Sequence, residues 1–116
     1  MNTVTDTNDP TAHDEVNAIR DACRIPGSFQ LEGFDFYSSC EPCPMFLGAV
    51  YWARPARLFF ANGRQDAARV LFHDAIIYEE LSRTHGNRSF PAFQILSEEA
   101  GRAFELWERS PIKKSY

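Results

Sequence analysis

The sequence has 116 residues, of which 44% are hydrophobic and 24% are charged, and its formal net charge is −4. This composition is typical of a folded protein rather than a disordered chain, and the length suits one domain with its own core. The negative charge argues against nucleic acid as a partner, and no apolar run approaches the roughly 20 residues that cross a bilayer, so we expect no membrane contact.

The start of the chain and the cysteines indicate the compartment. Residues 1–9 are polar and acidic, unlike a secretory signal peptide. Three cysteines are an odd number without a disulfide-like framework. We therefore expect a cytoplasmic protein.

A first helix is predicted to begin at Pro10 and to end at Pro26-Gly27. Asp9 supplies a side-chain oxygen directly before Pro10, which is the pairing expected at a helix start. The helix then carries an apolar stripe at helical spacing, made of Ala12, Val16, Ile19 and Cys23. We interpret Cys23 as a buried thiol.

His13 and Glu15 lie on opposite flanks of this stripe. Both side chains could lean over one point beneath the first turn of the helix. The alternative is a partly exposed histidine and a glutamate favoured by the helix dipole, with no site at all.

A βαβ unit is predicted next. Residues 34–39 alternate as a strand, Pro42 and Pro44 open a helix that is apolar on nearly every side, and Pro55 ends it. Residues 57–62 then form a second strand. This order predicts a parallel pair of strands with a right-handed crossover through a short buried helix.

Four further segments complete the chain. Residues 65–82 are predicted to be helical with a break near 72–74, residues 84–89 to form a loop, and residues 93–96 to form a short edge strand. Residues 98–109 are predicted as a helix with one apolar face, made of Ala100, Ala103, Phe104 and Trp107.

The segment at residues 38–46 looks like part of a metal site. Cys40 and Cys43 are three residues apart, and Cys43 stands at a helix start, where a thiolate suits a divalent cation. The position one turn after Cys43 is Phe46. In α/β folds helix starts gather at the carboxyl edge of the sheet, so His13, Glu15 and Cys43 could converge on one metal.

A family resemblance rests on these residues. Residues 11–16 and 39–45 are similar to the His-x-Glu and Pro-Cys-x-x-Cys signature of zinc nucleobase deaminases, and within them to bacterial guanine deaminases. The likeness continues through residues 47–55, 72–78 and 113–116. It therefore covers nearly the whole chain.

The resemblance implies a fold. It is a cytidine deaminase-like α/β fold, a three-layer α/β/α sandwich, and residues 1–116 form a single truncated domain of this kind. The family carries a helix and two strands before the position of Asn2, and Met1 stands just ahead of it here. We expect the first helix and first two strands to be lacking.

The resemblance also implies a chemistry. His13 and Cys43 bind Zn²⁺ together with a second cysteine and a water molecule, which the metal acidifies. Glu15 is the catalytic residue that moves the proton of this water, so that guanine becomes xanthine and ammonia. The partner is thus a small-molecule purine base.

Four residues are implied to contact the base or close its pocket: Asp74, Asn2, Trp52 and Tyr116. Asp74 accepts hydrogen bonds from the purine edge and Asn2 takes a second contact position, while Trp52 and Tyr116 help to close the pocket. Core packing is an equal alternative for Trp52, and a helix N-cap is an alternative for Asp74.

The main departure from the family is Phe46, which occupies the position of the second zinc cysteine. A phenyl ring supplies no ligand, so we expect weak or absent zinc binding. Cys40 is a possible substitute ligand, because Cys40 and Cys43 have a ligand-like spacing.

Two functional interpretations follow. The first is a guanine deaminase in which Phe46 is tolerated or Cys40 is recruited. The second is a catalytically inactive deaminase-fold remnant, or pseudoenzyme, that acts as a dimerisation or binding module. The resemblance implies a homodimer with exchanged C-terminal segments, to which the helix at residues 98–109 is suited. A nucleic-acid-editing deaminase is disfavoured by the net charge.

Overall fold

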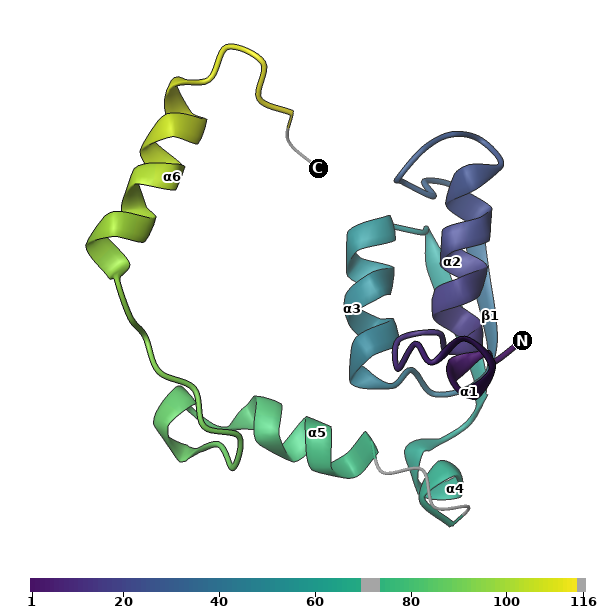
Figure 1. Cartoon of the computed structure of the whole chain (residues 1–116). Helices are drawn as coiled ribbons and strands as arrows, with labels where there is room; N and C mark the ends of the chain where they lie inside the picture. The colour runs from purple at the N-terminus through teal and green to yellow at the C-terminus, as the bar shows by residue number, and fades with distance from the viewer. Residues whose placement is uncertain (70–73, 115–116) are drawn as a thin grey trace. The chain divides into compact units, whose positions relative to one another are not determined.

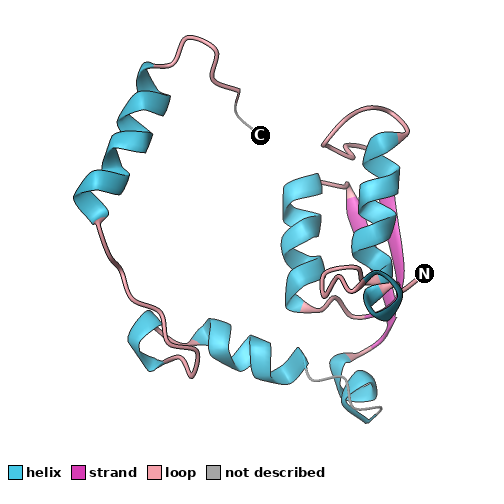
Figure 2. Cartoon of the chain, viewed as in Figure 1, coloured by secondary structure: helices cyan, strands magenta, loops and turns pink. Residues whose placement is uncertain are grey.

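The computed structural model describes residues 1–69 and 74–114 (Figure 1). The chain forms two compact units, Met1–Glu79 and Glu80–Tyr116. The single domain expected over residues 1–116 stays a prediction. Figure 2 shows that helices and loops make up most of both units and that the strands lie in the first.

The first unit begins with two helices, α1 (Val4–Thr7) and α2 (Asp14–Arg24). The predicted start of α2 at Pro10 is wrong, because residues 9–12 form turns instead. The Asp9 carboxylate accepts hydrogen bonds from both the backbone N–H and the hydroxyl of Thr11, at 2.8 and 2.7 Å. This local bonding competes with the helix, which therefore begins after His13.

The predicted βαβ unit is present as β1 (Asp35–Cys40), α3 (Pro44–Ala53) and β2 (Arg57–Asn62). The strands pair in parallel, with Asp35 opposite Arg57 and Cys40 opposite Asn62. Arg57 also forms a bidentate ion pair with Asp35, at 2.9 and 2.7 Å. Because the two charges face each other at one end of the ladder, they favour this register.

α3 begins at Pro44, the second of the two prolines, with Cys43 as its N-cap. It ends where Arg54 adopts a left-handed conformation, with φ of 53°, directly before Pro55. Proline disfavours helical backbone in the residue before it, which explains this boundary. The predicted stop at Pro55 is confirmed.

α2 and α3 lie side by side over one face of the sheet (Figure 1). The predicted stripe of α2 is confirmed, since Val16 and Ile19 are buried and Cys23 packs against the core. Leu31 and Phe46 are the largest fully buried side chains. The core joins α2, β1, α3 and β2, and its members include Ile19, Leu31, Phe36, Phe46, Val50, Ala53 and Leu58.

The expectation that α3 is a buried helix is wrong for one of its sides. Tyr51 is 76% exposed and Trp52 is 62% exposed. An all-apolar helix is buried only where neighbours cover it, and α2 and the sheet cover one side of α3. Core packing of Trp52, one of its two alternatives, is therefore also wrong.

The helical region after β2 forms α4 (Arg64–Arg69) and α5 (Asp74–Ser82). The predicted break near residues 72–74 falls largely outside the described residues. The second unit contains the end of α5, a short 3₁₀-helix η1 (His85–Asn87) and α6 (Ser97–Arg109). In the described part of the chain, no helix is both long and apolar enough to span a membrane.

The edge strand predicted at residues 93–96 is wrong, because these residues have no regular structure. A strand needs a partner for its backbone groups, and the sheet of the described residues consists of β1 and β2 alone. Leu96, with φ of 51°, instead turns the chain directly into α6.

Replacing Phe46 by alanine tests its part in the core. Phe46 is 0% exposed, so Phe46→Ala should lower the free energy of unfolding by about 3–5 kcal/mol, as expected for a buried phenylalanine. Urea denaturation measures this change. The matched control is Phe29→Ala, because Phe29 is 58% exposed. Equal, small losses in both variants would show that the core does not depend on Phe46.

Candidate functional site

His13 and Cys43 meet at the N-terminal ends of two neighbouring helices. Each residue is an N-cap with extended backbone, His13 for α2 and Cys43 for α3. Their side chains approach to 3.9 Å between Nδ1 and Sγ. The predicted convergence of two helix starts is therefore present in the structure.

The Cys43 thiol caps its own helix. Its sulfur accepts a hydrogen bond from the backbone N–H of Phe46 at 3.3 Å. This bond satisfies one of the N–H groups that a helix leaves open in its first turn. The sulfur is thus held in place by α3 and directed to the side where His13 lies.

Two carboxylates act on this thiol. Burial raises the pKa of Cys43 above its ordinary value, and the negative charges of Asp74 and Glu15 raise it further, although the N–H groups of Phe46 and Met45 oppose the shift. Glu15 comes from the first turn of α2, and Asp74 is the first residue of α5. All four side chains are half-buried, and we use the name His13 cluster for His13, Cys43 and the two carboxylates that act electrostatically on the thiol, Glu15 and Asp74.

Phe46 lies one turn into α3, directly after this cluster. Its ring is fully buried and lies 5.5 Å from the ring of Phe36 on β1, measured between centroids. The side chain points into the core between α2, α3 and the sheet. An apolar ring therefore fills the place in the helix where a second ligand would follow Cys43.

The described residues do not fit a catalytic zinc ion. Such a site takes three protein ligands and keeps one position open. Among residues 1–69 and 74–114, no group of three His, Cys, Asp or Glu side chains could hold a metal ion. His13 and Cys43 provide a two-ligand pair, and Phe46 adds no donor atom to it.

Cys40, the possible substitute ligand, is the last residue of β1 and is half-buried. Alternation along the strand places it on the same face as Phe36, which is the face covered by the helices. Its backbone N–H bonds to the Ser38 hydroxyl at 3.3 Å. A role for the Cys40 sulfur as a ligand stays a prediction.

Of the remaining predicted contacts, Asn2 directly precedes Thr3, whose backbone N–H bonds to the carbonyl of Ala12 next to His13 at 3.1 Å, whereas Trp52 lies away from the His13 cluster. Asn2 is exposed, and its side-chain oxygen accepts a hydrogen bond from the N–H of Val4 at the start of α1. Trp52 is in the last turn of α3, which at about 1.5 Å per residue lies roughly 13 Å from Cys43 along the helix axis. Tyr116 lies outside the described residues.

The sequence did not point to a second group next to the cluster, formed by Glu41, Arg64 and Tyr78. Arg64 pairs with Glu41 at 2.8 Å, and its guanidinium lies 3.7 Å from the centre of the Tyr78 ring. Glu41 follows β1 and Arg64 follows β2, and the two strands pair in parallel. The opposite charges at these two strand ends could therefore have predicted the ion pair. Tyr78 offered none.

The fold and this pair of helix starts define a class of protein. Residues 1–62 match the model of the cytidine and deoxycytidylate deaminase zinc-binding region. The chain therefore belongs to this family of zinc-binding deaminases, and its α/β fold is cytidine deaminase-like, as the resemblance implied.

Within the family the chain is guanine deaminase-like. It is 47% identical to the guanine deaminase of Bacillus subtilis over all of its 116 residues, which cover 74% of that protein. The X-ray structure of that enzyme superposes with a TM-score of 0.91 over 99% of this chain and 73% of the other. The chain is also 30% identical to the tRNA-specific adenosine deaminase of Aquifex aeolicus, over 98% of this chain and 63% of that protein.

The acid-base behaviour of Cys43 provides a test of the cluster. Because the negative charge of Asp74 disfavours the thiolate, Asp74→Asn should lower the pKa of Cys43. The pH dependence of thiolate absorbance, compared with and without Cys43→Ser, measures this value. Asp66→Asn removes an exposed carboxylate on α4 and is the matched control, for which no shift is expected. An unchanged pKa in Asp74→Asn would place Asp74 outside the cluster.

Proposed function

We propose that this chain binds a purine base of the guanine type at the His13 cluster. The observation that carries the proposal is the approach of His13 and Cys43 to 3.9 Å, with Glu15 and Asp74 close enough to shift the pKa of the thiol. The 47% identity to a guanine deaminase supports the choice of base.

Each carboxylate has a distinct part in this proposal. Guanine presents N–H donors on its amide edge, and an ionised carboxylate accepts such bonds, so Asp74 would hold the base there. Glu15, in the first turn of α2, would take or give a proton. Asn2 and Tyr116 remain further proposed contacts of the base, whereas Trp52, at the far end of α3, is not proposed as one.

We further propose that hydrolytic deamination of guanine to xanthine and ammonia is severely impaired. The family binds zinc, but here the position one turn after Cys43 holds the buried ring of Phe46, which provides no third donor atom beside His13 and Cys43. Two protein ligands hold Zn²⁺ far less tightly than three. The chain would thus keep the base site of a deaminase while losing most of its metal.

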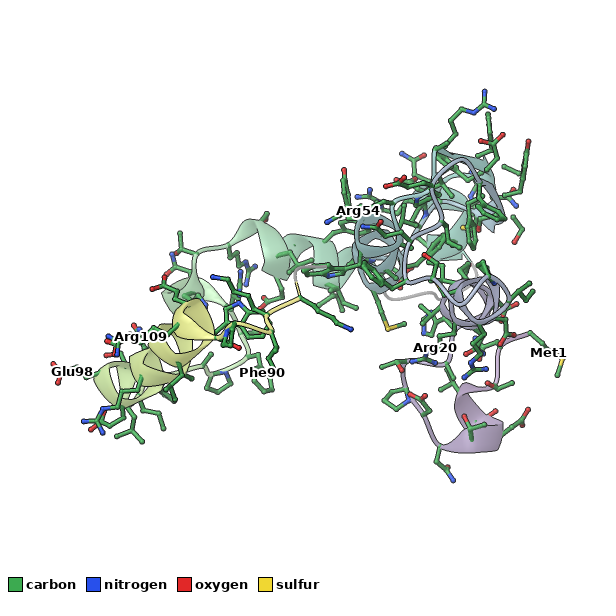
Figure 3. All side chains as sticks on the ribbon, turned by 90° about the horizontal axis from the view of Figure 1, so that it is seen from above. Met1, Arg20, Arg54, Phe90, Glu98 and Arg109 are labelled. Atoms are coloured by element: carbon green, nitrogen blue, oxygen red, sulfur yellow. The ribbon has the colours of Figure 1, made fainter. Side chains whose placement is uncertain are left out.

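A second candidate function is that of a non-catalytic dimerisation module. It is favoured by α6, in which Phe104 and Trp107 lie three residues apart on one face and are 74% and 49% exposed. Figure 3 shows the side chains of this helix, with Glu98 near its start and Arg109 at its end. An exposed apolar helix face of this kind suits a second copy of the chain, as in a homodimer with exchanged C-terminal segments.

Zinc content and turnover test the impaired site. Purified protein should hold clearly less than one zinc per chain and release little ammonia from guanine. Phe46→Cys restores a third donor and should raise zinc content severalfold, measured by plasma mass spectrometry.

Two controls accompany this measurement. Phe46→Ser removes the ring without adding a thiol. It therefore distinguishes the effect of the added zinc ligand on zinc content from the effect of the lost core packing. Cys40→Ala should leave zinc content unchanged unless Cys40 is itself a ligand. One tight zinc per unsubstituted chain would contradict the proposal.

The oligomeric state tests the dimerisation module. Light scattering behind size-exclusion chromatography should give the mass of two chains at tens of micromolar protein. Phe104→Glu should shift the protein to one chain, because a charge replaces an apolar contact. Arg102→Glu, on the same helix, is the control and should leave the mass unchanged. A monomer in the unsubstituted protein would rule this function out.

A further inference from the structure

The turn that carries Cys43 is held from outside by Arg64. The residue before Pro42 is Glu41, and its carboxylate accepts two hydrogen bonds from Arg64, one from the backbone N–H at 2.9 Å and one from Nη2 at 2.8 Å. An exposed ion pair alone contributes little. Here the backbone bond and the side-chain bond together fix both position and direction of the Glu41 carboxylate, whose pKa they lower.

Tyr78 holds the same turn from α5. Its hydroxyl donates a hydrogen bond to the backbone carbonyl of Pro42 at 2.5 Å, and Pro42 is the residue directly before Cys43. Burial raises the pKa of this hydroxyl, which keeps its proton available for the bond. The guanidinium of Arg64 stacks over the Tyr78 ring at 3.7 Å, so the two contacts are linked.

Tyr78 also fixes the face of α5 that carries Asp74. The two residues are four positions apart in the same helix and so lie one above the other on one face. A bond that ties Tyr78 to Pro42 therefore also sets how Asp74 stands toward Cys43. The negative charge of Asp74 raises the pKa of Cys43, and the charge of the Cys43 thiolate raises the pKa of Tyr78, which agrees with this placement.

We propose that Arg64 and Tyr78 are positioning residues of the base site: they clamp the Glu41-Pro42 turn and thereby fix Cys43 and Asp74 relative to each other. Neither side chain belongs to the His13 cluster; each contacts the turn that precedes Cys43. The part of the proposal that concerns Asp74 and the base rests on the proposed function, whereas the part that concerns the turn rests on the contacts alone.

The first experiment follows the accessibility of Cys43 in the full chain. Iodoacetamide labelling is quantified at each cysteine by peptide mass spectrometry, with Cys23 as the reference inside the same molecule. Tyr78→Phe removes one hydrogen bond and keeps the ring, and Arg64→Lys keeps the charge and loses the fork. Each should raise the labelling of Cys43 relative to Cys23 by about three- to tenfold, as expected for the loss of a hydrogen bond that closes the turn.

The chain offers matched controls for both substitutions. Arg57 also forms a bidentate pair with a carboxylate, that of Asp35, and also lies over a ring, that of Phe59. Tyr37 stacks on the same ring and is 72% exposed. Arg57→Lys and Tyr37→Phe should leave the labelling ratio unchanged. If Tyr78→Phe and Arg64→Lys do the same, or raise Cys23 as much as Cys43, the clamp is overturned.

The second experiment measures guanine affinity by equilibrium dialysis. Tyr78→Phe should raise the Kd for guanine by about three- to tenfold, and should add nothing in the Asp74→Asn background, because both changes then act on one contact. Equal weakening in both backgrounds would overturn the link to Asp74. If the unsubstituted chain does not bind guanine, the proposed function fails, and the labelling ratio still decides whether the turn is clamped.

Discussion

The structure of the first unit depends on the burial of Phe46. Its ring is fully enclosed, contacts Phe36 on β1, and lies in the one core that α2, α3 and the two strands share. In a zinc deaminase the metal would draw the same helix starts together, because binding energy at such a site is also folding energy. In this chain the buried ring of Phe46 packs at that point, between the two helices that begin after His13 and Cys43.

The proposed function separates base recognition from zinc-dependent hydrolysis. His13 and Cys43 still meet at two helix starts, and the negative charges of Glu15 and Asp74 act on the thiol; we propose that these groups recognise a base. A third metal ligand is missing from the described residues. We therefore predict that the chain binds the base but hydrolyses it poorly. We also propose that contacts outside the cluster, such as that of Tyr78 with Pro42, fix the geometry of the cluster.

Much of the fold was predictable from the sequence, and the reasons are local. Strand periodicity, the paired prolines and Pro55 defined β1, α3 and β2 closely, and the apolar stripe identified the buried side of α2. The start of α2 was missed because the side chain of Asp9 bonds to Thr11 and delays the helix. The exposure of Trp52 and the absence of a strand at residues 93–96 depend on which neighbours are present, which no local pattern encodes. The family motif singled out His13, Glu15 and Cys43 as candidate site residues. The contact of Tyr78 with Pro42 joins residues that are far apart in the sequence, so no local pattern could predict it.

The central claim is that base recognition survives without the metal. Calorimetric titration of guanine into protein freed of metal by a chelator tests it most directly, with the same titration after adding one equivalent of Zn²⁺. We expect saturable binding of one guanine per chain in the metal-free protein and a Kd that zinc changes little. Binding that appears only after zinc is added would contradict the account.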